Sequence, residues 1–427
     1  MLYIKIGVIN LLLIVCILEV VGVGLFYKNF SDFFYTSPSK QTAKTNDQFQ
    51  VLDAVFNPYF GYVIRHDHKS PVKNKGWTTN NQGFQFRKGY KRAGRAGTER
   101  CCDYPYYPKK REVLIGIFGG SVAAGLAITM QNKNIDRLLE KLAQFKGKKI
   151  TVLNFSVAGF RQPQSLQVLS YMASIGQKLD YVINIDGFNE AVTSRLNLSV
   201  GSEWTYPDSN IWSNMGKRLE RLARAVNAGD SDFLAPTWYA LMGRKMQRNS
   251  MECNFSSCYL WYYFRQYIYA KQEQQSVQLA SQRKEMAWSQ FRVNLRSPKN
   301  LPIEVNAENI SMLTAQLWGK SSELMAHISK KIGARYIHIL QPNQWFDSNY
   351  KPSVKNHSFK HVPPIVSSTY PHLVEHGEKI LKNHPNLIFK NFAKLLPGND
   401  NSLFSDDCCH YTPKGNRIVI NEIAKLF

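Results

Sequence analysis

Short apolar runs alternate with segments of helical spacing in two parts of the chain, residues 111–190 and 335–427. Apolar, β-branched runs of strand length predict five strands, at residues 113–118, 150–155, 181–185, 336–340 and 387–389. Apolar residues three or four positions apart predict helices at residues 135–145, 166–175 and 310–332. Strands that alternate with helices in this way predict an α/β fold with a five-stranded parallel sheet.

The alternation breaks between these two parts, and we expect a mostly helical insertion at about residues 196–308. Helices are predicted within it at residues 212–226 and 260–291. The stretch 259–269 carries aromatic side chains on nearly every face. A buried helix explains such a stretch, and a cap that faces a membrane or a substrate is the alternative.

The N-terminal end has a different pattern, because residues 6–27 are mostly apolar and lie between Lys5 and Lys28. A run of this length can span a bilayer core as one helix. It is longer than the apolar core of a usual signal peptide, and no Ala-x-Ala-like cleavage site follows. We therefore expect a transmembrane anchor at residues 1–28 in preference to a cleaved signal. A polar linker at 29–50, an irregular lead-in segment at 51–110 and the main domain at 111–427 follow it.

The net charge of the chain indicates which kind of binding partner to expect. It has 54 Lys and Arg against 31 Asp and Glu, a formal net charge of +23. Such an excess favours an anionic neighbour, which can be membrane headgroups, an acidic polysaccharide or nucleic acid. The basic residues are spread along the chain and form no zinc-finger or RNA-binding signature. We therefore expect no nucleic-acid partner.

The cysteines bear on the compartment. Cys16 lies in the apolar run, and the other six follow it, an even number that predicts disulfides in an oxidising compartment. Cys253 and Cys258 are the easiest pair to join. We therefore expect the domain to lie in the periplasm or outside the cell. No paired Cys-x-x-Cys motif is present, so no structural zinc site is expected. No cofactor is expected either.

The strand predicted at 113–118 runs into Gly119, Gly120 and Ser121, and small residues follow. The two glycines allow a tight turn, and the serine hydroxyl would then be exposed at the start of a helix. The backbone N–H of Ser121 would lie where a developing oxyanion is stabilised. The alternative is that Ser121 only caps the helix.

A second candidate motif lies near the C-terminus, where Asp407 precedes His410 by three residues. An aspartate on the same short loop can hold the imidazole in the tautomer that accepts a proton at its far nitrogen. Two turns that follow predicted strands contain Gly159 and Asn189, which could supply further oxyanion donors or be ordinary turn and cap residues. Carboxyl ends of parallel strands share one edge, so Ser121 and His410 could meet there.

Serine, glycine, asparagine and Asp-x-x-His, in this order at successive strand ends, resemble the SGNH hydrolases, also called GDSL-type esterases. The resemblance covers residues 111–190 and 335–427, and residues 57–84 look like the lead-in of membrane-tethered bacterial members. It implies a flavodoxin-like α/β/α sandwich. It also implies Ser121 as nucleophile, His410 as general base and Asp407 as the orienting acid. The oxyanion hole would consist of the Ser121 N–H, the Gly159 N–H and the Asn189 side chain.

The function implied is hydrolysis of O-acyl esters on an envelope polysaccharide, or of lipid esters, through an acyl-enzyme. An O-acyltransferase on an envelope polysaccharide and a non-catalytic glycan- or protein-binding module on the same fold are the alternatives. Gly120 departs from the family, whose name-giving motif has aspartate before the serine.

The adjacent Cys408 and Cys409 also depart from the family. A disulfide from either of them to Cys101 or Cys102 would tie the loop of His410 to the lead-in segment. Residues 406–410, two aspartates, two cysteines and a histidine, could instead ligate a metal. Adjacent cysteines reach one tetrahedral ion with difficulty, so no metal is expected.

Overall fold

The sheet has five strands, and all neighbouring strands run parallel. In chain order the strands are β5 (Glu112–Gly119), β6 (Lys149–Asn154), β7 (Tyr181–Asp186), β8 (Arg335–Leu340) and β9 (Leu387–Asn391). A computed structural model describes residues 2–30, 35, 54–66, 76–87, 90, 102–212, 215, 260, 264, 267, 304–346, 362–381, 384–400 and 402–427. The spatial order β6-β5-β7-β8-β9 is the order of doubly wound sheets in which ligands bind where the winding direction reverses. That point lies between β5 and β7.

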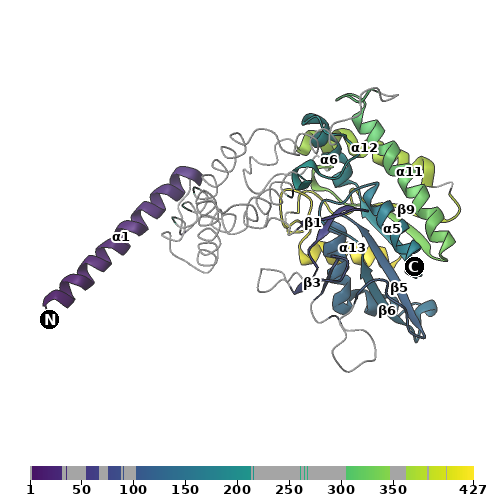
Figure 1. Ribbon diagram of the computed structural model, residues 1–427, viewed down its shortest axis with the longest axis horizontal. Helices are drawn as coiled ribbons and strands as arrows, with labels where there is room; N and C mark the ends of the chain where they lie inside the picture. The colour runs from purple at the N-terminus through teal and green to yellow at the C-terminus, as the bar shows by residue number, and fades with distance from the viewer. Residues whose placement is uncertain are drawn as a thin grey trace, which may run out of the picture. The chain divides into compact units, whose positions relative to one another are not determined.

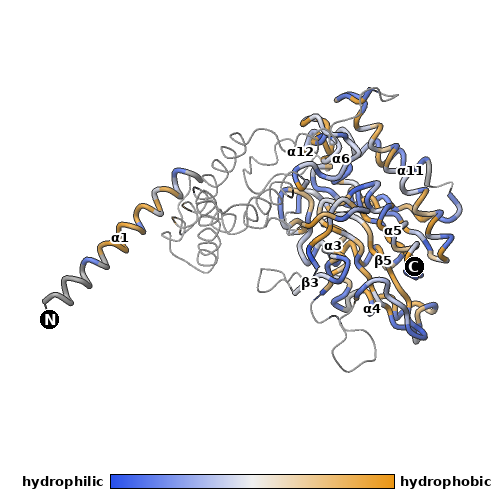
Figure 2. The backbone as a smooth tube through the Cα atoms, in the orientation of Figure 1, coloured by the Kyte–Doolittle hydropathy of each residue, from blue (hydrophilic) through white to orange (hydrophobic). Residues whose placement is uncertain are grey.

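Each face of the sheet has its own apolar core, because side chains alternate along the strands. In β5, Ile115 and Ile117 belong to one cluster, and Leu114 and Phe118 belong to the other. Helices α3 (Ser121–Thr129), α6 (Phe188–Ser199), α12 (Val362–Leu381) and α13 (Pro413–Ala424) contribute to the first cluster. Helices α5 (Gln164–Ser174) and α11 (Ile310–Lys331) pack on the second (Figure 1). Figure 2 shows the apolar strands inside this shell of helices.

Before the sheet come two antiparallel hairpins, β1 (Ala54–Asn57) with β2 (Gly61–Ile64) and β3 (Trp77–Thr79) with β4 (Gln85–Arg87). Their aromatic residues Phe60, Tyr62 and Phe84 are fully buried in the second cluster. The hydroxyl of Tyr62 donates to the carbonyl of Ala158, 3.0 Å away. The lead-in is therefore part of the domain core and supports the turn that contains Gly159.

The five predicted strands are confirmed, with bounds shifted by two residues at most. The helix predicted at 135–145 is wrong in part, because α4 covers only Ile135–Leu139. It follows a π-helical turn, Met130–Asn134, and precedes a 3-10 turn, Ala143–Phe145. Helix α12 was not predicted at all. It contains Pro371, and proline inside a helix normally argues against one.

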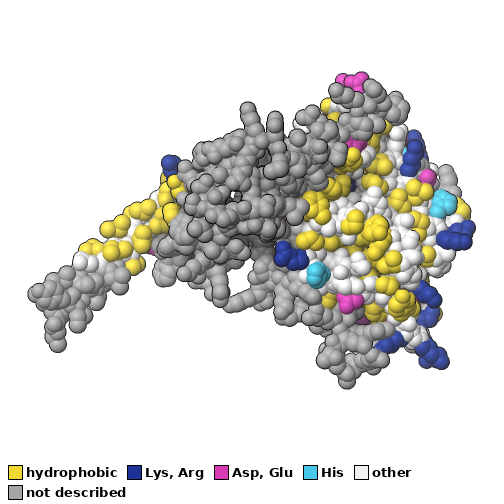
Figure 3. All heavy atoms as spheres, in the orientation of Figure 1, with side chains coloured by type: hydrophobic (Ala, Val, Ile, Leu, Met, Phe, Trp, Pro, Cys, Tyr) yellow, Lys and Arg dark blue, Asp and Glu magenta, His cyan; other side chains and the backbone are white. Residues whose placement is uncertain are grey.

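The chain divides into two units, Met1–Val51 with Gly216–Val293, and Leu52–Met215 with Asn294–Phe427. The first unit contains α1 (Leu2–Phe30), a helix of 29 residues. None of the helices within the described ranges is both long enough and apolar enough to cross a bilayer, so the predicted anchor is not confirmed. The helices predicted at 212–226 and 260–291 lie almost entirely outside the described residues. Figure 3 shows Lys and Arg side chains in several separate places on one face.

Candidate active site

Ser121 is the first residue of α3 and directly follows the turn that ends β5. The N-cap of this helix is Gly120, and no side chain caps it, so the alternative that Ser121 only caps the helix is wrong. The Oγ atom of Ser121 lies 2.7 Å from Nε2 of His410 instead. First-turn N–H groups have no partner inside the helix, so the N–H of Ser121 is available at this position.

The two glycines before Ser121 are required for different reasons. Gly119 has φ +133°, and a Cβ there would run into the backbone carbonyl of Ile185 on the neighbouring strand β7. Gly120 has an ordinary backbone conformation, but a Cβ on it would overlap the side-chain nitrogen of Asn189. The turn can therefore approach β7 and α6 closely only because neither residue has a side chain.

The carboxylate that contacts His410 belongs to Asp406, and the prediction of Asp407 is wrong. Nδ1 of His410 lies 2.5 Å from Oδ2 of Asp406. Asp407 is largely buried, and its backbone carbonyl accepts a hydrogen bond from Nε1 of Trp345 at 2.8 Å. Asp406, His410 and Ser121 thus form a continuous hydrogen-bonded chain.

Asp406 is held by the loop that it begins. Its Oδ1 accepts backbone N–H groups from Cys408 and Cys409 at 3.0 Å and from His410 at 3.2 Å. Burial alone would raise the pKa of Asp406, but the bonds from His410 and from these N–H groups outweigh it and hold the pKa below its usual value. Asp406 is therefore a carboxylate near neutral pH. The carbonyl of Asp406 also accepts Nε2 of Gln344 at 3.0 Å, which ties the loop to the end of β8.

Asn189 and the carbonyl of Phe160, the residue after Gly159, both lie beside Gly120. Nδ2 of Asn189 donates to the carbonyl of Phe160 at 2.8 Å and packs against Gly120, the residue before Ser121. Gly159 directly precedes Phe160 and has φ +82°. A Cβ on Gly159 would meet the hydroxyl of Tyr62 and the side chain of Ile211. The turn is thus shaped by the lead-in hairpin and by the segment that follows α6.

A second Ser-His-Asp chain, which the sequence did not indicate, is buried inside the fold. Nε2 of His338 contacts Oδ1 of Asp186 at 2.8 Å, and Nδ1 of His338 contacts Oγ of Ser322 at 2.7 Å. Asp186 also accepts Nε1 of Trp318 at 2.6 Å and Nδ2 of Asn184 at 2.6 Å. The His338 side chain is 0% exposed, whereas that of His410 is 38% exposed. Only the chain that ends in Ser121 is open to a substrate.

Glu190, the residue after Asn189, connects the start of α6 to the segment that follows Gly159. Its Oε2 accepts the N–H of Gly187 at 2.7 Å, and its Oε1 accepts the N–H of Gln162 at 2.8 Å. The bond to Gly187 caps the N-terminal end of α6. Burial and the nearby charge of Asp186 raise the pKa of Glu190 to about 8.

A groove of about 560 Å³ lies between the far end of α3 and the start of α13. Two guanidinium side chains, Arg87 and Arg417, line it together with Thr129, Asn132 and Asn416. Pro413, three residues after His410, is also at its wall. Its lining suits an anionic group.

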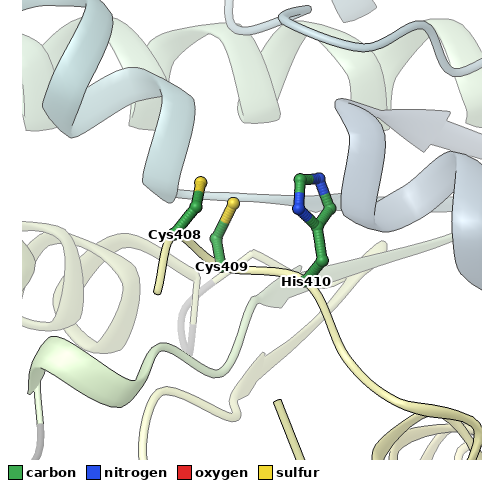
Figure 4. A group of neighbouring side chains, drawn as sticks. All are labelled: Cys408, Cys409 and His410. Carbon is green, nitrogen blue, oxygen red and sulfur yellow. The ribbon is translucent and has the colours of Figure 1, made fainter. Parts of the chain in front are cut away.

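The thiols of Cys408 and Cys409 are free, so the hypothesised disulfide from this pair to the lead-in segment is wrong. Cys101, Cys253 and Cys258 lie outside the described residues. Within the described ranges, one group of three His, Cys, Asp or Glu side chains could hold a metal ion (Figure 4). It consists of Cys408, Cys409 and His410.

No protein-family model matches the chain, and no curated protein is similar to it in sequence. A solved structure, the lipase Lip_vut3 from a goat rumen metagenome, is similar with a TM-score of 0.33 and 10% identity. The match covers 74% of this chain and 96% of the lipase. At this identity and TM-score it carries no argument about activity.

Proposed function

We propose that the protein is a serine ester hydrolase of the SGNH type with Ser121 as nucleophile, His410 as general base and Asp406 as its orienting acid. One observation carries the proposal, the chain of contacts from Oγ of Ser121 to Nε2 of His410 and from Nδ1 to Asp406, at 2.7 and 2.5 Å. Such a chain on a part-exposed edge activates a serine hydroxyl.

The reaction follows from this arrangement. Oγ of Ser121 attacks the ester carbonyl while its proton moves to Nε2 of His410. The negative oxygen of the tetrahedral intermediate accepts the N–H groups of Ser121 and Gly159 and the side-chain amide of Asn189. His410 then gives its proton to the leaving alcohol. Water, deprotonated by His410, hydrolyses the acyl-enzyme and frees Ser121.

The ester is carried by an acidic molecule, an O-acylated envelope polysaccharide or an anionic lipid. Two features support this class: the net charge of +23 and the groove lined by Arg87 and Arg417. The even number of cysteines after Cys16 further supports a catalytic domain in the periplasm or outside the cell. Fractionation of cells, with protease added to intact spheroplasts, tests the location.

Labelling of the full chain with a fluorophosphonate tests the nucleophile. We expect Ser121→Ala to abolish both labelling and hydrolysis of a short aryl ester. Ser322→Ala is the matched control, because Ser322 also lies 2.7 Å from a histidine nitrogen but is buried. It should keep labelling. Equal labelling of folded wild type and Ser121→Ala would sink the proposal.

A further inference from the structure

The loop that holds His410 carries two thiols on the same side of the chain. Adjacent residues of an extended strand point to opposite faces, but residues 406–410 form a tight turn in which one carboxylate oxygen accepts three successive N–H groups. Figure 4 shows the sulfur atoms of Cys408 and Cys409 pointing away from the backbone in a similar direction, with a ring nitrogen of His410 facing Cys409.

The three side chains are close enough to share an ion. The two sulfur atoms and a nitrogen of His410 all lie within 4.8 Å of one another. Zinc–sulfur bonds are about 2.3 Å long, so two sulfurs on one tetrahedral zinc are about 3.8 Å apart. This separation is compatible with ligand atoms that all lie within 4.8 Å of one another. The turn therefore removes the geometric objection to adjacent cysteines as joint ligands.

We propose that Cys408, Cys409 and His410 form an inhibitory site for a thiophilic divalent cation, with Zn²⁺ as its natural occupant. Zinc prefers thiolate and imidazole ligands in tetrahedral geometry, and three protein ligands leave one position for water. The part-exposed side chain of His410 and the intermediate exposure of Cys408 provide a way in, whereas Cys409 is buried.

The binding step needs no oxidant or reductant. Each thiol releases one proton to solvent as its sulfur bonds to the ion, and His410 contributes a nitrogen lone pair.

Inhibition follows from the proposed function, on which this part of the inference rests. If the ion takes Nδ1 of His410, it displaces Asp406 and leaves the ring proton on Nε2, which can then only donate to Ser121. If it takes Nε2, it displaces Ser121 directly. Both arrangements remove the base that would accept the proton of Ser121.

Absorption of the full chain with Co²⁺ tests the site without any turnover. We expect a sulfur-to-cobalt charge-transfer band that saturates at one ion per chain and disappears in the double variant Cys408→Ser/Cys409→Ser. Cys16→Ser, which removes a free thiol elsewhere, is the control and should keep the band. A band that survives in the double variant, or no band in wild type, overturns the site.

Inhibition of aryl ester hydrolysis by Zn²⁺ tests the consequence, with each variant compared with its own metal-free rate. We expect the zinc concentration for half inhibition to rise at least about tenfold in the double variant and a chelator to restore wild-type activity. Equal zinc sensitivity in wild type and double variant overturns the inhibitory role. A cobalt band in a protein that no fluorophosphonate labels would leave the metal site standing and remove the hydrolase.

Discussion

The Nδ1 atom of His410 lies 2.5 Å from Oδ2 of Asp406, and the neighbouring Asp407 turns its carbonyl toward Trp345. The backbone of the loop decides between the two aspartates. Three N–H groups that follow Asp406 bind its second oxygen, so this carboxylate is held in contact with the ring.

Asp406→Asn should therefore lower kcat for an aryl ester by about 10³- to 10⁴-fold, because an amide no longer holds the ring in the accepting tautomer. Asp407→Asn is the matched control, one residue away with the same change of charge, and should stay within about tenfold of wild type. Steady-state kinetics on protein with native circular dichroism measures both. The reverse order of effects would restore Asp407 as the orienting acid.

Gly120→Ala should reduce activity through Asn189. The added Cβ would overlap Nδ2 of Asn189 and press on the carbonyl of Phe160, which Asn189 binds. We expect kcat to fall by about 10²- to 10³-fold, the usual loss for one oxyanion donor, with little change in KM.

Gly125→Ala in the same helix is the control, because nothing lies within 4 Å of its Cβ position. Alanine is the better helix former, so this variant should keep its activity and gain about 0.5–1 kcal/mol in stability. If both alanine variants behave alike, close packing on Asn189 is not the reason for glycine at position 120.

The stability of the protein should depend on pH through Glu190. Its pKa is about 8 in the folded protein and about 4.3 in an unfolded chain. Between these values the folded state binds more protons than the unfolded state. The contribution of Glu190 to the free energy of unfolding is therefore fully present below about pH 4.3 and is lost as the pH rises toward 8. The loss is at most about 1.4 kcal/mol per pH unit for one proton.

Urea unfolding between pH 5 and 8 measures this slope, and Glu190→Gln should flatten it. Glu112→Gln is the control. Despite the opposing effect of burial, hydrogen bonds from Lys109, Thr151 and Tyr106 lower the pKa of Glu112, so it titrates below this range. An unchanged slope in Glu190→Gln would mean that Glu190 is ionised throughout.

The groove lined by Arg87 and Arg417 should set preference for acidic substrates. Replacing both with glutamine should raise KM for a carboxylated aryl ester by about tenfold or more, with kcat and the neutral ester little affected. Arg335→Gln is the control for loss of an arginine elsewhere, because Arg335 is exposed at the start of β8 and is not among the residues that line the groove. Equal effects on neutral and acidic esters would contradict a role in substrate choice.

The sequence alone determined the strands and the residue types at their ends. Val113 to Phe118 is apolar and β-branched because both faces of the strand are covered, and this pattern is local. The two glycines before Ser121, Gly119 and Gly120, can also be recognised in the sequence, because a turn that has no room for Cβ atoms requires glycine. Helix α12 was not predicted, because its prolines argue against a helix at these residues. Tertiary packing stabilises this helix in the folded protein.

Only the tertiary structure decided which aspartate faces His410. Asp406 and Asp407 are chemically identical, and the choice depends on a loop held by Gln344 and Trp345, more than sixty residues earlier in the chain. The tertiary structure also separated the exposed chain at Ser121 from the buried chain at Ser322, because burial depends on contacts far apart in sequence. A residue's type is local, whereas its partner and its exposure are properties of the packed fold.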